Sequence, residues 1–229
     1  MENIMTFDPG PIFLTLKLAF VTTAVLLVIG VPLAYWLAYT RRWFSCLIEP
    51  LVSMPLVLPP TVLGFYLLVL FSPQSTLGHF LETHFHIRVV FTFLGLVIGS
   101  VILSLPFMVN PVKAGFEAIP TSLIESAYTL GKSKRETFTR VLIPNNLPAI
   151  LTGAVMSFAH TIGEFGVVLM VGGNIPRKTR VVSMAIYSEV EALNYPAAHF
   201  YSIFLVILAF AIIFALNIFN KRRVRTFIS

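Results

Sequence analysis

The stretch ESAYTLGKSKRETFTRVLIP, from Glu125 to Pro144, is a polar and basic island between strongly apolar runs. Two helix-start signals lie at its edge and within it, Ser122-x-x-Glu125 and Ser133-x-x-Glu136, and each fits a capping box. Gly131 lies where the first helix should end, and Pro144 is expected to end the second. We therefore predict two short helices hinged at Gly131, on a loop between membrane spans.

The rest of the chain is apolar enough to need the bilayer as its solvent. Hydrophobic residues make up 57% of the 229 residues and charged residues 11%, against roughly 25% charged in an average soluble domain. The mean hydropathy is +0.87. The net charge of +6 does not indicate a nucleic-acid partner, because the basic residues cluster at the ends of apolar runs. Membrane lipid is the expected surrounding.

Five apolar runs are long enough to cross the hydrocarbon core as helices, which takes about 20 residues. They are roughly Ile12–Tyr39, Leu51–Phe71, Val89–Val109, Ile150–Val171 and Phe200–Phe219. The sequence thus predicts an all-α polytopic membrane protein, with one transmembrane domain over residues 1–229 and a cytoplasmic loop at about 111–148. The run Val181–Leu193 is short and carries two glutamates, so we expect a helix outside the bilayer or at its surface.

The distribution of lysine and arginine predicts the orientation. Basic residues gather after the first span, between the third and fourth, and after the fifth: Arg41, Arg42, Lys113, Lys132, Lys134, Arg135, Arg140, Lys221, Arg222, Arg223 and Arg225. If these segments are cytoplasmic, the N-terminus is outside and the C-terminus inside. The RKTR run at 177–180 then lies outside and is the one feature against this orientation.

The island resembles the cytoplasmic loop of bacterial ABC importer permeases, which has the form E-A-A-x3-G-x9-I-x-L-P. The matching positions are Glu125, Ser126, Ala127, Gly131, Val141, Ile143 and Pro144. Three of them depart mildly, since Ser126, Val141 and Ile143 replace Ala, Ile and Leu. The resemblance implies that this loop docks in a groove of a separate ATP-hydrolysing subunit.

Two further runs, Met54–Phe71 and Ser157–Arg180, are similar to the molybdate branch of these permeases, and the tungstate and sulfate branches share much of the pattern. The resemblance covers nearly the whole chain. It implies a type I importer in the bacterial inner membrane, made of a homodimer of this chain, two ATPase subunits and an external oxyanion-binding protein, working by alternating access. Its cargo would be an oxyanion, most closely molybdate, with tungstate or sulfate and thiosulfate as alternatives.

The chain itself is not expected to bind ATP. Gly131-Lys132-Ser133 resembles the end of a phosphate-binding loop, but that loop needs a glycine at position 126, where this chain has serine, and a preceding strand. We therefore expect no cofactor and no catalytic residue here, and ATP with Mg²⁺ on the partner subunit.

Glu164 is the only acidic residue deep in a predicted span, where a charge is expensive and indicates function. Three polar residues precede it at helical spacing, so that all four share one face: Ser157, His160, Thr161 and Glu164. This stripe either lines the translocation pathway or makes structural hydrogen bonds between helices. Because a carboxylate repels an oxyanion, Glu164 is predicted to be a gate or an anchor rather than a ligand.

Pro59 and Pro60 are expected to break a helix inside or at the edge of the membrane, where irregular backbone must line a cavity or be buried. Broken helices of transporters can present N–H groups to anions. We prefer the simpler interpretation, that a helix begins there. His79, His84 and His86 share an external loop but lack a fourth ligand, so no metal site is predicted.

Two other functions compete with a transport subunit. An intramembrane enzyme could use His160 and Glu164 as an acid/base pair, but no nucleophile is obviously placed. A channel or secondary transporter that works without ATP leaves the capped helices around Gly131 unexplained.

Overall fold

A computed structural model describes residues 8–40 and 43–228, with the side chains of 217 and 219–228 left aside. Within these ranges all regular secondary structure is helical. The helices are α1 (Gly10–Tyr39), α2 (Trp43–Ser53), the 3₁₀ turn η1 (Met54–Leu56), α3 (Pro60–Phe71), α4 (Thr76–Phe85), α5 (Phe93–Glu117), α6 (Thr121–Thr129), α7 (Lys134–Thr137), the π-helical segment η2 (Phe138–Leu142), α8 (Ile143–Gly163), α9 (Gly166–Gly172), α10 (Val182–Glu191) and α11 (Tyr195–Ile228). Arg41, Arg42 and the side chains of the basic residues at 221–225 lie outside the described part.

Four helical segments are long and apolar enough to cross a membrane: α1, α5, the continuous helix Lys134–Gly163, and Tyr195–Leu216 of α11. The predicted second span, Leu51–Phe71, is wrong as a single helix. It is replaced by α2 with η1, then α3, and the two parts are bent by 110°. Proline causes the break: Pro59 is extended, with ψ of 131°, and α3 begins at Pro60, as we preferred. A fifth crossing exists only if this bent pair counts as one span.

The predicted fourth span, Ile150–Val171, is also wrong as a continuous helix. α8 ends at Gly163, Glu164 is extended, and α9 starts at Gly166. The carboxylate of Glu164 accepts a hydrogen bond from the Val167 N–H at 2.9 Å. It therefore satisfies a backbone donor at the start of α9, which makes the break tolerable in a buried place.

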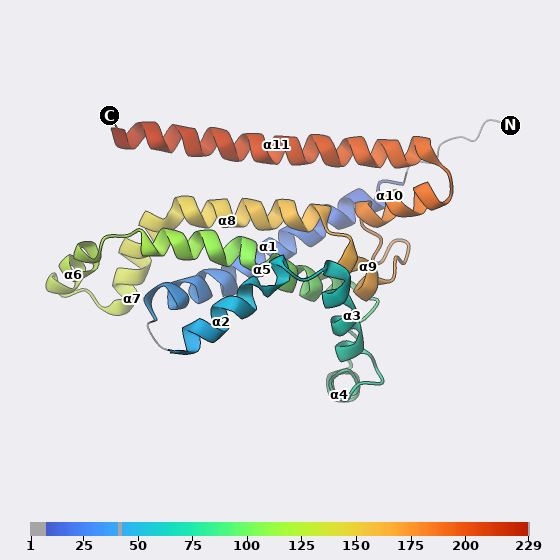
Figure 1. Cartoon of the computed structure of the whole chain (residues 1–229), viewed down its shortest axis with the longest axis horizontal. Coiled ribbons are helices and arrows are strands. Elements are labelled where there is room, and N and C mark those ends of the chain that lie inside the picture. The colour runs from blue at the N-terminus through green and yellow to red at the C-terminus, as the bar shows by residue number, and fades with distance from the viewer. Residues whose placement is uncertain (1–7, 41–42, 229) are drawn as a thin grey trace.

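The core of the molecule is formed where α1, α5 and α8 pack together (Figure 1). Its largest buried cluster includes Leu26 of α1, Phe116 of α5 and Ile150 of α8. Glycines allow the closest approaches. A β-carbon on Gly99 of α5 would lie 2.6 Å from Val167 of α9, and one on Gly95, a turn earlier, would lie 2.9 Å from Val171. These two glycines of α5 therefore pack against the short helix α9 rather than against another span.

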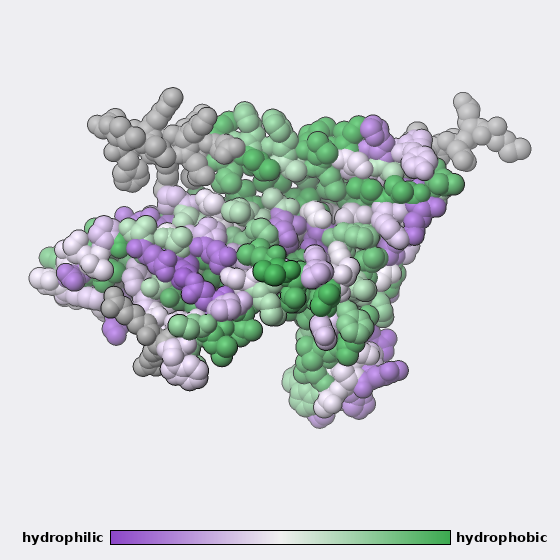
Figure 2. All heavy atoms as spheres, viewed as in Figure 1, coloured by the Kyte–Doolittle hydropathy of each residue, from purple (hydrophilic) through white to green (hydrophobic). Residues whose placement is uncertain are grey.

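Different helices lie at the two ends of the molecule along its long axis (Figure 1). One end carries α6, α7 and the C-terminal end of α11, and the other carries the start of α1, α10 and the start of α11. Figure 2 shows apolar side chains over much of α11, and its exposed residues include Val206, Phe210 and Phe214. Such an apolar exterior fits lipid or protein contacts in a bilayer.

Candidate functional site

The segment from Thr121 to Leu142, called here the helical knob, projects from one end of the bundle (Figure 1). α6 ends in a Schellman motif: the Lys132 N–H bonds the Ala127 carbonyl at 3.0 Å and the Gly131 N–H bonds the Tyr128 carbonyl at 2.9 Å. Gly131 has φ of +75°, the left-handed conformation that glycine adopts without steric cost. The predicted hinge at Gly131 is therefore observed.

The second predicted capping box is also observed. Ser133 Oγ accepts from the Glu136 N–H, and Glu136 Oε2 accepts from the Ser133 N–H, both at 3.2 Å. The first is wrong: α6 begins at Thr121, so Ser122 lies inside the first turn and caps nothing. Pro120 occupies the N-cap position instead, and its extended backbone separates α6 from the segment before it.

Pro144 does not end the second helix, contrary to our expectation. α7, η2 and α8 run on as one helix to Gly163. The π-helical turn before the proline explains this, because the Ile143 N–H donates to the Phe138 carbonyl in that wider turn. The extra residue makes room for a ring that would otherwise clash with the preceding turn.

Aromatic side chains join the knob to the bundle. Phe138 in η2 packs on Tyr35 of α1, with ring centroids 4.7 Å apart, and on Phe116 of α5, at 6.3 Å. Tyr39 Oη donates to the Phe116 carbonyl at 3.0 Å. Further along, Asn146 Nδ2 donates to the Val112 carbonyl at 2.9 Å. The knob and the start of α8 are therefore in direct contact with α1 and α5.

The knob presents both charge and apolar surface to its surroundings. Its most exposed large hydrophobic side chain is Leu130, at 79% exposure, and Leu123 and Tyr128 are exposed as well. Glu125 and Ser126 are exposed on α6, whereas Ala127 is buried. Val141 and Ile143 are half-buried and Pro144 is exposed.

The residues predicted to line a pathway divide into two groups. Pro60 and the break at Glu164 lie together, because a β-carbon on Gly166 would be 2.8 Å from the Pro60 side chain. Glu164 itself is 6% exposed. Its main-chain carbonyl accepts from Ser183 at 2.6 Å, which ties the break to α10. Pro59, beside Pro60, is exposed.

The other group packs between α8 and α5. Ser104 Oγ lies 3.0 Å from His160 Nδ1 and 3.1 Å from Thr161 Oγ1. The Ser157 hydroxyl donates to the Ser104 carbonyl at 3.5 Å. His160 is also stacked on Phe107, with ring centroids 4.1 Å apart. These polar residues therefore make hydrogen bonds between helices. Glu164, beyond the end of α8, is linked to them through its main-chain N–H, which donates to the Thr161 carbonyl at 3.4 Å, whereas its carboxylate accepts from Val167.

Several residues that organise these sites were not found from the sequence. Ser104 comes more than 50 residues before its partners, and no local pattern indicates that pairing. The π turn and the Phe116 contacts likewise depend on tertiary packing. The break at Glu164 did leave a local signal, the flanking Gly163 and Gly166.

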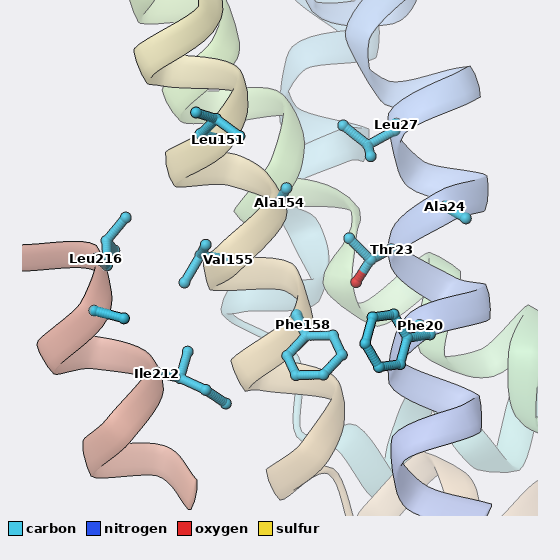
Figure 3. Close-up of a pocket in the computed structure, with 11 residues that line it drawn as sticks. Phe20, Thr23, Ala24, Leu27, Leu151, Ala154, Val155, Phe158, Ile212 and Leu216 are labelled. Carbon is cyan, nitrogen blue, oxygen red and sulfur yellow. The ribbon is translucent and has the colours of Figure 1, made fainter. Parts of the chain in front are cut away.

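A cavity of about 630 Å³ lies between α1, α8 and α11 (Figure 3). Phe20, Leu27 and Phe158 are among its lining side chains, and Thr23 contributes the one hydroxyl. A doubly charged anion would lose its hydration there without gaining donors. This cavity is therefore not an anion site.

Residues 30–227 match the family described as binding-protein-dependent transport system inner membrane component. The chain is 47% identical over 222 residues to the molybdenum transport system permease protein ModB of Azotobacter vinelandii, covering 97% of each chain. It is 33% identical over 208 residues to the sulfate transport system permease protein CysT of Salmonella typhimurium, covering 91% of this chain and 75% of that one.

Two solved structures share the architecture. One is the inward-facing MetNI methionine ABC transporter, with a TM-score of 0.74 at 20% identity, covering 97% of this chain and 99% of that chain. The other is a bacterial alginate ABC transporter in complex with an alginate pentasaccharide-bound periplasmic protein, with a TM-score of 0.71 at 19% identity, covering 93% and 79%. The all-α fold of an ABC importer transmembrane domain, predicted from the sequence, is confirmed.

Proposed function

The chain belongs to the family of binding-protein-dependent transport system inner membrane components, and from that premise we propose that it is the membrane-spanning subunit of an ATP-driven molybdate importer. The resemblance seen in the loop signature is thereby confirmed at the level of the family. The helical knob carries the mechanistic part of the proposal. It is the projecting, internally capped element through which a second protein could move the bundle.

We assign ATP and Mg²⁺ to a separate ATPase subunit that grips the knob from the cytoplasm. Glu125, Ser126 and Leu130 are exposed there for contact, while Ala127 and Gly131 set the shape of the turn. Lys134 and Arg135 are basic and exposed, so we expect them to face acidic residues at the rim of the groove on the ATPase subunit. This orientation places the C-terminus inside and the N-terminus outside.

The proposed cycle uses rigid coupling. When two ATPase subunits close on nucleotide, their grooves approach and carry the knobs of a homodimer with them. The packing of Phe138 on Tyr35 and Phe116 passes this motion to α1 and α5. At the far end, α3 and α9 meet at Pro60 and Gly166, where the broken backbone can part and reclose. Ser157, His160, Thr161 and Glu164 then hold α5, α8 and α9 in register, and Glu164 serves as an anchor of the gate.

An external oxyanion-binding protein is the proposed source of substrate. The family is defined by dependence on a binding protein, and the alginate transporter was solved with its periplasmic partner. The exposed apolar surface of α11 is available for lipid and for the second copy of the chain. The proposed location is the bacterial inner membrane.

Molybdate is preferred over sulfate because of the relatives. The molybdenum permease is 47% identical over nearly the whole of both chains, whereas the sulfate permease is 33% identical. Sulfate remains the second candidate, since both anions are tetrahedral and doubly charged; tungstate and thiosulfate belong to the same class.

The test is ATP hydrolysis by the assembled importer in lipid nanodiscs, measured with its binding protein loaded with molybdate, tungstate, sulfate or thiosulfate in turn. We expect the largest stimulation with molybdate. Stimulation by sulfate alone would move the assignment to the second candidate. Failure of any ATPase subunit to assemble with the chain would contradict the importer itself.

A further inference from the structure

The loop between α9 and α10 is built as a rigid, positively charged projection. Thr179 is fully buried, and its hydroxyl donates to the Gly172 carbonyl at 2.7 Å and accepts from the Ile175 N–H at 3.0 Å. The Ile175 carbonyl accepts from three successive N–H groups, those of Lys178, Thr179 and Arg180, at 3.0–3.2 Å. These hydrogen bonds within the loop therefore fix the path of its backbone.

Side chains fasten the loop to the neighbouring helix. Arg180 Nε donates to Asn174 Oδ1 at 3.0 Å, and Asn174 Nδ2 donates to Ser188 Oγ of α10 at 2.8 Å. Asn174 and Arg177 have φ of 54° and 61°. Arginine rarely adopts this left-handed conformation, and such strained backbone persists only where the surroundings hold it. The surrounding hydrogen bonds therefore hold Arg177 in a backbone conformation that arginine rarely adopts.

This shape exposes two cations without a counter-charge. Arg177 and Lys178 are exposed, and neither forms an ion pair with any carboxylate of the described chain. By contrast, Arg88, which follows α4, is paired with Glu82 at 2.6 Å. The loop follows α9, away from the helical knob along the long axis of the molecule (Figure 1). On that outer side, cations run against the usual distribution of Lys and Arg, so their presence needs a cause.

We propose that Arg177 and Lys178 form a preformed docking point for an acidic surface patch on the external solute-binding protein. The inference rests on the proposed function and adds to it the surface, the residues and the charge of the partner. Unpaired charges on a rigid rim speed productive encounter and fix orientation, because they attract a complementary patch before contact. Because the backbone of the loop is already held by hydrogen bonds, little conformational entropy is lost in ordering it when the partner binds.

The experiment measures ATP hydrolysis by the complete importer in nanodiscs as a function of the concentration of its molybdate-loaded binding protein. Arg177→Glu and Lys178→Glu are each compared with Arg88→Glu, which makes the same change of charge at an exposed arginine outside the loop. We expect the half-maximal concentration of binding protein to rise about tenfold for each loop variant at low salt. The rise should shrink at high salt, where charges are screened, and Arg88→Glu should stay near wild type.

Lys178→Glu keeps the test valid if Arg177→Glu fails to fold, because Lys178 does not have the left-handed backbone of Arg177. The proposal is overturned if both loop variants keep the wild-type half-maximal concentration, or if Arg88→Glu shifts it equally. It is also overturned if the defect follows the anionic lipid content of the nanodisc, which would assign the loop to the membrane surface. If the wild-type importer shows no response to any binding protein, the proposed function falls as well, so the two failures are distinguishable.

Discussion

At the scale of single residues, Gly131 sets the shape of the helical knob. A β-carbon there would meet no atom within 4 Å, so the only obstacle to substitution is the left-handed backbone. We predict that Gly131→Val weakens binding of the ATPase subunit by about 5- to 30-fold, since the free valine variant relaxes out of the left-handed turn and restoring that turn on binding costs roughly 1–2 kcal/mol. Gly131→Asn should lose less, because asparagine tolerates this conformation. The dissociation constants of the purified subunits measure both, and a valine variant that binds like wild type would contradict the account.

Glu164 gives a second prediction at this scale. Its carboxylate accepts the Val167 N–H, and a glutamine oxygen can do the same. We therefore expect Glu164→Gln to keep most of the stability, while Glu164→Ala loses about 1 kcal/mol, or roughly 2–4 °C in thermal unfolding in detergent. If the glutamine variant is as unstable as the alanine variant, the negative charge matters and the capping explanation is wrong.

Residue-level prediction from sequence succeeded where the determining contacts are local. The capping box of Ser133 and Glu136 spans four residues, and the turn at Gly131 depends on glycine itself. It failed for Ser122, although the same pattern is present, because Pro120 already occupies the cap. The contact of Ser104 with His160 joins distant parts of the chain, and nothing in the local sequence encodes it.

At the scale of helices, close packing of α5 on α9 yields a compensation test. We predict that Gly99→Ala destabilises the protein by about 1–3 kcal/mol, because the new methyl would lie 2.6 Å from Val167 Cγ1. Val167→Ala should relieve much of that loss in the double variant. Thermal unfolding of the two single variants and the double variant gives the coupling energy, and purely additive effects would show that the helices do not meet as described.

Helix boundaries were the least predictable part of the architecture. Apolar runs located α1, α5 and α11, since hydropathy depends only on composition, but α5 begins at Phe93 rather than Val89 and continues past Val109 to Glu117. Hydropathy could not show that α8 ends before Glu164, whose carboxylate accepts an N–H at the start of α9. Nor could it show that the π turn allows the helix to continue through Pro144. The prolines at 59 and 60 indicated a break but not the 110° bend.

At the scale of the whole molecule, the two ends have different proposed functions: one binds the ATPase subunit, and the other carries the gate and the basic loop. The aromatic contacts of Phe138 connect the helical knob with α1 and α5, and these helices run toward the end where α9 and the basic loop lie (Figure 1). We propose that a nucleotide-driven subunit grips the knob from inside the cell. All other parts of the proposed cycle depend on that contact.

Site-specific cross-linking can detect this contact between the knob and the ATPase subunit. Cys46 is the chain's single cysteine, so Leu130→Cys in a Cys46→Ser background places one thiol at the most exposed large hydrophobic position of the knob. We predict that this thiol reacts only with reagents that reach the cytoplasmic side, and that it cross-links to the ATPase subunit with a yield that changes on addition of ATP. A matched Phe210→Cys on α11, which is 69% exposed, should not cross-link to that subunit. Labelling of the Leu130→Cys thiol from outside, or no cross-link to the ATPase subunit in the active complex, would contradict the account.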